Sequence, residues 1–165
     1  MSNRSVIISE ILKKHKNAFF VISNGLSSRE AAYFDRQSRC LYLLHAMGEA
    51  LSVGIGISQI LKDMEIVVID GDGNALMGMS SWCLMPIRNL KYYILKNGCY
   101  ETTGGQEISE FPILPKWCHV ISISVGKDKT PNPPHPEEIW KDATNWLKIN
   151  KHIGIKNWKL SLKLI

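Results

Sequence analysis

Two short polar motifs, each placed just after an apolar run, are the part of this sequence best suited to chemistry. Asp72 lies in a Gly-Asp-Gly motif that follows the apolar run 65–70. Asn97 follows the run 90–95 and lies 25 residues after Asp72. Carboxylate, amide and backbone carbonyl oxygens are hard ligands that suit Mg²⁺, with water and phosphates completing its octahedron. The pair of motifs therefore predicts a site for Mg²⁺ and a ligand that carries phosphate.

The residues after Asp72 indicate how a phosphate would be held. Gly73 has no side chain, so the backbone there can approach a phosphate closely. A helix expected to begin at Asn74 would offer free backbone N–H groups and the positive end of its dipole. Taken singly, each motif also fits an ordinary turn, because Gly-Asp-Gly and Asn-Gly are common turn sequences. Their combination, at a spacing that holds one helix and one strand, favours a functional site.

The elements that must position these motifs alternate along the chain. Alternating helices and strands predict an α/β fold in which a parallel sheet has helices on both faces. Ligands bind outside the carboxyl ends of such strands, and Asn24, Asp72 and Asn97 fall there. Many small residues in 48–61 indicate a helix packed closely on another backbone. Apolar runs suggest strands at 18–23, 40–44, 65–70, 90–95 and 117–125, and helices at 5–15, from about 29 with Ser27 or Ser28 as its cap, and at 48–61, 74–85 and 136–147.

Composition narrows the class of protein. With 165 residues, 45% hydrophobic and 21% charged, the chain suits one globular domain, here expected over 1–150, followed by a basic tail at 151–165. No apolar run approaches the ~20 residues that span a bilayer, and no signal peptide is recognised, so a cytoplasmic protein is expected. Four scattered cysteines argue against a zinc site or a disulfide framework. A net charge of +5 that is not concentrated in one stretch makes nucleic-acid binding a weak hypothesis.

Three longer segments carry a more specific signal. Residues 97–106 have the sequence NGCYETTGGQ, residues 28–30 are Ser-Arg-Glu, and residues 45–48 are His-Ala-Met-Gly. With the Gly-Asp-Gly motif, they resemble the NGxxExTGGQ, SRE and GSMG segments of phosphonopyruvate and sulfopyruvate decarboxylases, which use thiamine diphosphate (ThDP). The chain departs from that pattern at Asn24, Lys96 and His45. The resemblance covers roughly residues 5–148 and implies the diphosphate-binding domain of a ThDP enzyme.

The resemblance also implies which residues hold the cofactor and its metal. Asp72, the Asn97 side chain and the backbone carbonyl of Cys99 would bind Mg²⁺, and backbone N–H groups near Gly73 and Asn74 would hold the diphosphate. A bulky side chain at position 47 would keep ThDP bent, and the carbonyl of residue 45 would accept its 4′-amino group. His45 is also a candidate for contact with substrate, or for packing. The residues expected to bind ThDP are His45, Met47, Gly71, Gly73, Asn74 and Tyr100.

The same resemblance implies a divided enzyme. In this family the glutamate that activates ThDP lies on a separate pyrimidine-binding domain, and neither Glu49 nor Glu101 matches it by position. No catalytic side chain is therefore expected in this chain. An α-type partner subunit, in a heterodimer, a heterotetramer or a larger assembly, would supply it for decarboxylation of a small anionic 2-oxo acid. Two alternatives stay open: a silent or regulatory ThDP-binding subunit, and another ThDP reaction such as carboligation or oxidative decarboxylation.

Overall fold

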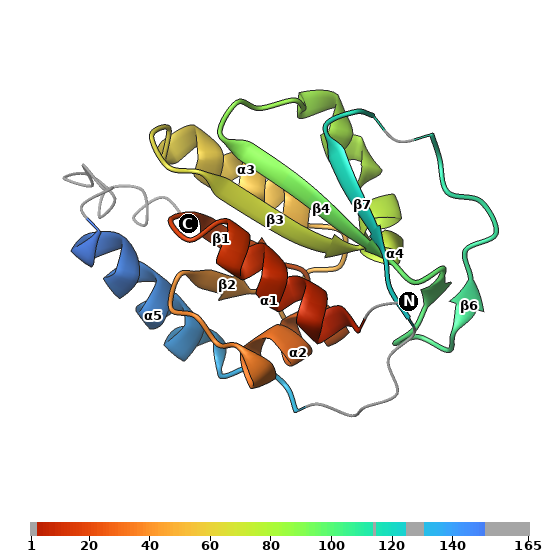
Figure 1. Ribbon diagram of the computed structural model, residues 1–165, viewed down its shortest axis with the longest axis horizontal. Helices are drawn as coiled ribbons and strands as arrows, with labels where there is room; N and C mark the ends of the chain where they lie inside the picture. Colours follow the sequence, from red (N-terminus) through yellow and green to blue (C-terminus); the bar gives the residue numbers. More distant parts are fainter. Residues whose placement is uncertain (1–2, 114, 125–130, 151–165) are drawn as a thin grey trace.

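Five parallel strands form the central sheet, in the order β2-β1-β3-β4-β7 (Figure 1). The computed structural model describes residues 3–113, 115–124 and 131–150. The predicted parallel α/β sheet is confirmed. Its strands are β1 (Phe19–Ile22), β2 (Cys40–Tyr42), β3 (Ile66–Gly71), β4 (Leu90–Lys96) and β7 (Cys118–Ser122).

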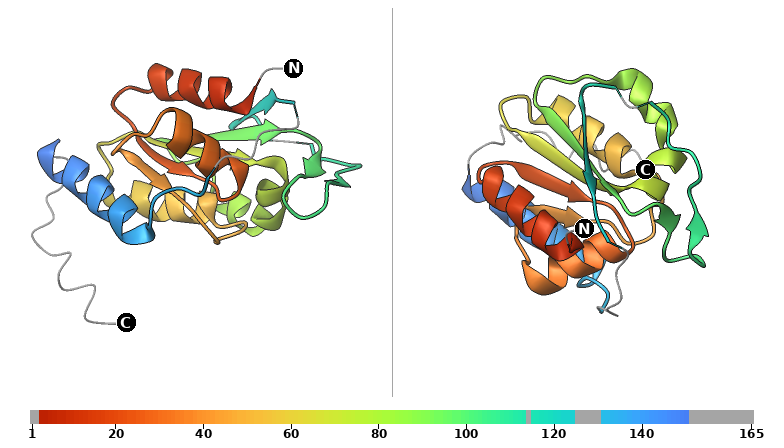
Figure 2. Two further views of the ribbon diagram at one scale, coloured as in Figure 1. Left: turned by 90° about the horizontal axis from the view of Figure 1, so that it is seen from below. Right: turned by 45° about the vertical axis from the view of Figure 1, so that its right-hand side comes forward.

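Helices cover both faces of this sheet, as Figure 2 shows. On one face α1 (Arg4–Lys14) and α2 (Leu26–Phe34) pack on alternate strand residues such as Phe20 and Ile22. On the other, α3 (Ala50–Ile60) packs on the intervening residues, such as Val21. The helix α5 (Pro136–Ile149) contacts the edge strand β2. Strands buried on both faces explain the continuous apolar runs in the sequence.

The structure departs most from the prediction at two helices. The helix expected over 74–85 is divided into α4 (Asp72–Met77) and a 3-10 helix, η1 (Met79–Leu84). The backbones of Gly78 and Gly48 meet at this break, where a Cβ atom on Gly78 would lie 2.2 Å from the Gly48 oxygen.

The predicted cap of α2 is also wrong. This helix starts at Leu26 after Gly25, whose φ of 79° turns the chain out of β1. The Ser28 hydroxyl donates to the Ile22 carbonyl (3.0 Å), so it holds the helix to the strand end and does not cap the helix. Both Ser27 and Ser28 lie inside the helix.

A short hairpin that the sequence did not indicate follows β4. Its strands, β5 (Cys99–Tyr100) and β6 (Gln106–Glu107), pair antiparallel beside the carboxyl end of the sheet (Figure 1). The hairpin carries most of the NGCYETTGGQ segment. The basic tail at 151–165 lies outside the described residues. Over the described ranges, no helix is long and apolar enough to cross a membrane.

Candidate functional site

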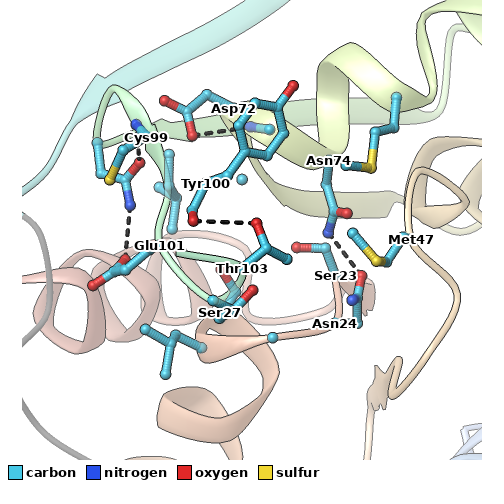
Figure 3. A pocket seen from close by; sticks show the side chains of 18 of the residues that line it. Ser23, Asn24, Ser27, Met47, Asp72, Asn74, Cys99, Tyr100, Glu101 and Thr103 are labelled. Atoms are coloured by element: carbon cyan, nitrogen blue, oxygen red, sulfur yellow. Dashed lines mark hydrogen bonds between the residues drawn. The ribbon is translucent and has the colours of Figure 1, made fainter. Parts of the chain in front are cut away.

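A cavity at the carboxyl ends of β1, β3 and β4 brings together residues that lie far apart in the sequence (Figure 3). The β1–α2 loop, the loop before α3, the start of α4 and the β5–β6 hairpin all contribute to its lining. Eight of the nine residues predicted to bind ThDP or Mg²⁺ line this cavity: Met47, Gly71, Asp72, Gly73, Asn74, Asn97, Cys99 and Tyr100.

The Asp72 carboxylate is buried at the edge of this cavity, with 2% of the residue exposed. Its Oδ1 accepts from the Gly73 N–H (3.0 Å) and its Oδ2 from the Gly98 N–H (2.7 Å). Within the described ranges no lysine, arginine or histidine forms an ion pair with it. Because a buried charge is costly unless it is paired or coordinates a metal, this carboxylate fits a cation ligand.

Asn97, just after β4, presents its amide to the same turn. Its Oδ1 accepts from the Cys99 N–H (3.0 Å), while its Nδ2 donates to Oε2 of Glu101 (2.7 Å). Asp72 and Asn97 thus bond to the consecutive N–H groups of Gly98 and Cys99. One carboxylate oxygen and one amide oxygen are held beside a single turn, which is a suitable donor set for a hard cation.

The Cys99 side chain contributes differently from its backbone. Burial raises the pKa of the Cys99 thiol, and the nearby Glu101 and Asp72 carboxylates raise it further. A thiol that stays protonated is a poor metal ligand, because the thiolate is the form that binds metals. Ligation by the backbone carbonyl of Cys99 stays a prediction.

Asn74 joins three of the loops that line the cavity. Its Nδ2 donates to Oδ1 of Asn24 (2.8 Å), after β1, and its Oδ1 accepts from the Gly48 N–H (3.2 Å), before α3 (Figure 3). The adjacent Met47 is 44% exposed and lines the cavity. The Asn74 side chain therefore positions the loop that carries Met47.

The space beside Gly71 is open. A Cβ atom built there would have no neighbour within 4 Å, and Gly71 lines the cavity. Next to it, the Asp70 carboxyl is fully enclosed, and burial raises its pKa to about 6. It accepts hydrogen bonds from the Tyr92 hydroxyl and from the Gly71 N–H, both at 2.9 Å. The Asp70 carboxyl therefore connects the end of β3 to Tyr92 on β4.

His45 is the one predicted residue outside this lining. It lies in a neighbouring hollow with Arg29 and His135, and its carbonyl accepts from the Met47 N–H (3.1 Å). Its expected contact with ThDP stays a prediction. Sequence reasoning missed Arg4 and Thr103 as lining residues. Arg4 gave no signal in the sequence, because it lies in the first turn of α1, far along the chain from either motif.

The donor set fits Mg²⁺ better than a softer metal. Among the residues that the structure describes, no group of three His, Cys, Asp or Glu side chains could hold a metal ion. The predicted set of one carboxylate, one side-chain amide and one backbone carbonyl is of another kind, and its oxygens suit Mg²⁺ that shares its coordination with phosphate. Open space at Gly71 leaves room for that phosphate.

Comparison with known proteins gives the same family. A model described as thiamine pyrophosphate enzyme, C-terminal TPP binding domain, matches residues 24–143; thiamine pyrophosphate (TPP) is another name for ThDP. The chain is 36% identical over 105 residues to the sulfopyruvate decarboxylase subunit beta of Methanocaldococcus jannaschii, covering 61% of this chain and 55% of that protein. It is 36% identical over 94 residues to the phosphonopyruvate decarboxylase of Streptomyces viridochromogenes, covering 55% of this chain and 23% of that protein.

These similarities cover part of each relative. The chain spans about half the length of the sulfopyruvate decarboxylase subunit and about a quarter of the phosphonopyruvate decarboxylase. The region matched by the family model holds the whole Gly-Asp-Gly to Asn97 segment, the β5–β6 hairpin and most of the sheet. This chain belongs to the family of thiamine pyrophosphate enzymes and carries their C-terminal TPP-binding domain.

Proposed function

We propose that this chain is one subunit of a ThDP- and Mg²⁺-dependent decarboxylase that acts on an anionic 2-oxo acid. Phosphonopyruvate and sulfopyruvate are the two candidate substrates. The observation that carries the proposal is the buried Asp72 carboxylate, which shares one turn with the Asn97 amide and has no cationic side-chain partner among the described residues. Similarity to proteins named sulfopyruvate and phosphonopyruvate decarboxylase supports the choice of reaction.

The predicted ligands and their neighbours in the cavity have defined tasks under this proposal. Asp72, Asn97 and the carbonyl of Cys99 would hold Mg²⁺, and the backbone at Gly71 and Gly73 would admit the diphosphate. Met47 would support the cofactor from the loop that Asn74 fixes. When bound, ThDP supplies the electron sink that loss of CO₂ from a 2-oxo acid requires. The chain itself would bind and orient the cofactor, and the negative carboxylate of Asp72 would bind the metal.

A partner chain is part of the proposal because, within the part of the chain that the structure describes, no free carboxyl group lines the cavity. Among the described residues, Asp72 and Glu101 are the carboxylates that line it. Asp72 is assigned to the metal, and Glu101 is bonded to Arg4 and Asn97. With both carboxylates engaged in this way, a glutamate from a pyrimidine-binding α-type subunit would exchange the proton with the aminopyrimidine of ThDP. The name "subunit beta" of several relatives supports this division.

The experiment is purification of the tagged chain from its own source under native conditions. The native mass, any co-purifying protein and any bound small molecule are then identified. A companion chain together with ThDP is expected. A lone chain without cofactor, which also fails to bind added ThDP and Mg²⁺, would overturn the proposal.

Substrate assays on the reconstituted pair then select the reaction. Release of CO₂ with phosphonoacetaldehyde or with sulfoacetaldehyde would identify the acid. Activity that appears only with an added aldehyde or an electron acceptor would instead show carboligation or oxidative decarboxylation. A pair that binds ThDP and turns over none of these would be a silent or regulatory subunit, which contradicts the proposed reaction.

A further inference from the structure

Arg4 is a buried cation in the first turn of α1, with 5% of the residue exposed. Its Nη1 donates to Oε1 of Glu30, on α2, at 2.5 Å. Its Nη2 donates to Oε2 of Glu101, 97 residues further along the chain. The two carboxylates are nearly as buried, with 7% and 11% of their side chains exposed. One arginine thus connects two helices and the hairpin beside the cavity.

Glu101 also binds Asn97, a predicted metal ligand. The same oxygen, Oε2, accepts from Arg4 and from Nδ2 of Asn97, the latter at 2.7 Å. A carboxylate can only accept hydrogen bonds, so it must face the NH₂ group of the amide. The amide oxygen of Asn97 then faces the turn of Gly98 and Cys99, where it accepts from the Cys99 N–H. Glu101 therefore fixes which end of the Asn97 amide faces that turn.

Stability alone is a weak reason for such a cluster. A buried ion pair often contributes little compared with apolar residues of similar volume. Here one guanidinium binds two carboxylates, from α2 and from the hairpin. Asp72 lines the same cavity as Arg4 and Glu101, is also buried, and has no cationic side-chain partner within the described ranges. A buried carboxylate without such a partner suits a divalent cation.

We propose that Arg4 and Glu101 are positioning residues for the metal site. Arg4 holds the Glu101 carboxylate, and Glu101 holds the Asn97 amide with its oxygen facing the turn to which Asp72 is also bonded. The Asn97 amide oxygen would then be oriented before the cation binds, so binding would not require the amide to rotate. This inference rests on the proposed function, because it assumes that Asp72 and Asn97 bind the metal.

Glu30 offers a matched control for Glu101. Glu30 is buried, Glu101 is nearly so, and both bind Arg4, but Glu101 is the one that accepts a hydrogen bond from Asn97. Glu101→Met and Glu30→Met each remove one partner of the same arginine. If the cluster only stabilises the fold, both variants lower the melting temperature and affect metal binding alike. If it orients Asn97, only Glu101→Met weakens metal binding strongly.

The experiment measures Mn²⁺ affinity by the paramagnetic resonance of free Mn²⁺, using the full chain with its partner subunit and ThDP. We expect Glu101→Met to weaken Mn²⁺ binding at least tenfold and Glu30→Met to change it less than twofold. Glu101→Gln keeps an acceptor oxygen and should recover part of the affinity. Arg4→Lys keeps the charge but loses the fork of donors, and should fall between wild type and Glu101→Met.

A double-variant comparison separates orientation from charge. In an Asn97→Ala background, Glu101→Met should produce no further loss, because its effect acts through the Asn97 amide. Additive losses would show that the Glu101 charge acts directly and would overturn the inference. Equal effects of Glu101→Met and Glu30→Met would overturn it as well. Failure of the wild-type complex to bind Mn²⁺ with ThDP would instead overturn the proposed metal site, and the inference with it.

Discussion

The ring of Tyr100 lies directly over Gly73, so closely that a Cβ atom on Gly73 would come within 2.7 Å of the Cδ1 and Cε1 atoms of that ring. The contact joins the β5–β6 hairpin to the first turn of α4. The second glycine of the Gly-Asp-Gly motif, Gly73, is therefore required by its contact with Tyr100. This requirement for glycine does not depend on a bound phosphate.

Substitution of Gly73 by alanine tests this contact. The added methyl group must displace the Tyr100 ring, and overpacking of this kind costs about 1–3 kcal/mol. Urea unfolding of Gly73→Ala should show that loss, together with weaker ThDP binding. Gly71→Ala is the matched control, since a Cβ atom there meets no neighbour within 4 Å. Equal unfolding free energies for the two variants would contradict the prediction.

Removal of the Asp72 carboxylate tests the metal site. Asp72→Ala should abolish Mg²⁺-dependent ThDP binding, because the variant lacks the buried charge that receives the cation. It also leaves the Gly73 and Gly98 N–H groups without their acceptor, which costs roughly 1–3 kcal/mol for a buried donor. Asp72→Asn keeps one of the two acceptor oxygens and should recover part of the stability without recovering binding.

Calorimetric titration of ThDP, with and without Mg²⁺, measures these effects. Asp63→Asn, at an exposed position, is the control for loss of one carboxylate elsewhere. Unchanged ThDP affinity in Asp72→Ala would show that the site has been assigned to the wrong residue.

Two glycines on α3 should respond to alanine in opposite ways. A Cβ atom on Gly54 would lie 2.2 Å from Cγ2 of Val68 on β3, whereas one on Gly56 would meet nothing within 4 Å. Gly54→Ala should therefore lose about 1–3 kcal/mol of stability by overpacking. Gly56→Ala should gain about 0.5–1 kcal/mol, because alanine is the better helix former. Urea unfolding measures both, and Val68→Ala should partly rescue Gly54→Ala.

The sequence predicted the sheet and the place of the motifs because both depend on local patterns. Long apolar runs mark strands buried on both faces, and the β3 and β4 runs ended within a residue or two of the expected positions. The small residues of 48–61 correctly indicated a closely packed helix, since Gly54 lies against Val68.

Other features depend on contacts between distant residues. The break in the 74–85 helix arises where Gly78 meets Gly48. The sequence around either glycine does not predict that contact. The link between Arg4 and Glu101 spans 97 residues, with no periodicity to reveal it. The strands of the hairpin have two residues each, too few for an alternating pattern. Such features follow from the tertiary fold and appear only once it is assembled.

Burial of the Asp70 carboxyl raises its pKa from 3.8 to about 6. Burial disfavours the charged form, and the hydrogen bonds from Tyr92 and Gly71 offset part of that effect. Below about pH 4 the carboxyl is protonated in both the folded and unfolded states. Between about pH 4 and pH 6 the unfolded state releases its proton first, so the contribution of Asp70 to stability falls as pH rises. Above about pH 6 the contribution of Asp70 to the free energy of unfolding stays at its lowest value, about 3 kcal/mol less favourable than at low pH, where the carboxyl is protonated in both states.

Asp70→Asn isolates this contribution, because asparagine stays neutral and keeps one acceptor oxygen. The chain is unfolded with urea at pH 5 and at pH 7.5, with a chelator present to exclude metal ions. The stability of wild type minus that of Asp70→Asn should fall by about 1 kcal/mol between the two values, since the remaining titration of the folded carboxyl lies in this window. Taking the difference cancels the other titrating groups that the two proteins share. A difference that stays constant with pH would show that the Asp70 carboxyl titrates alike in the folded and unfolded chain.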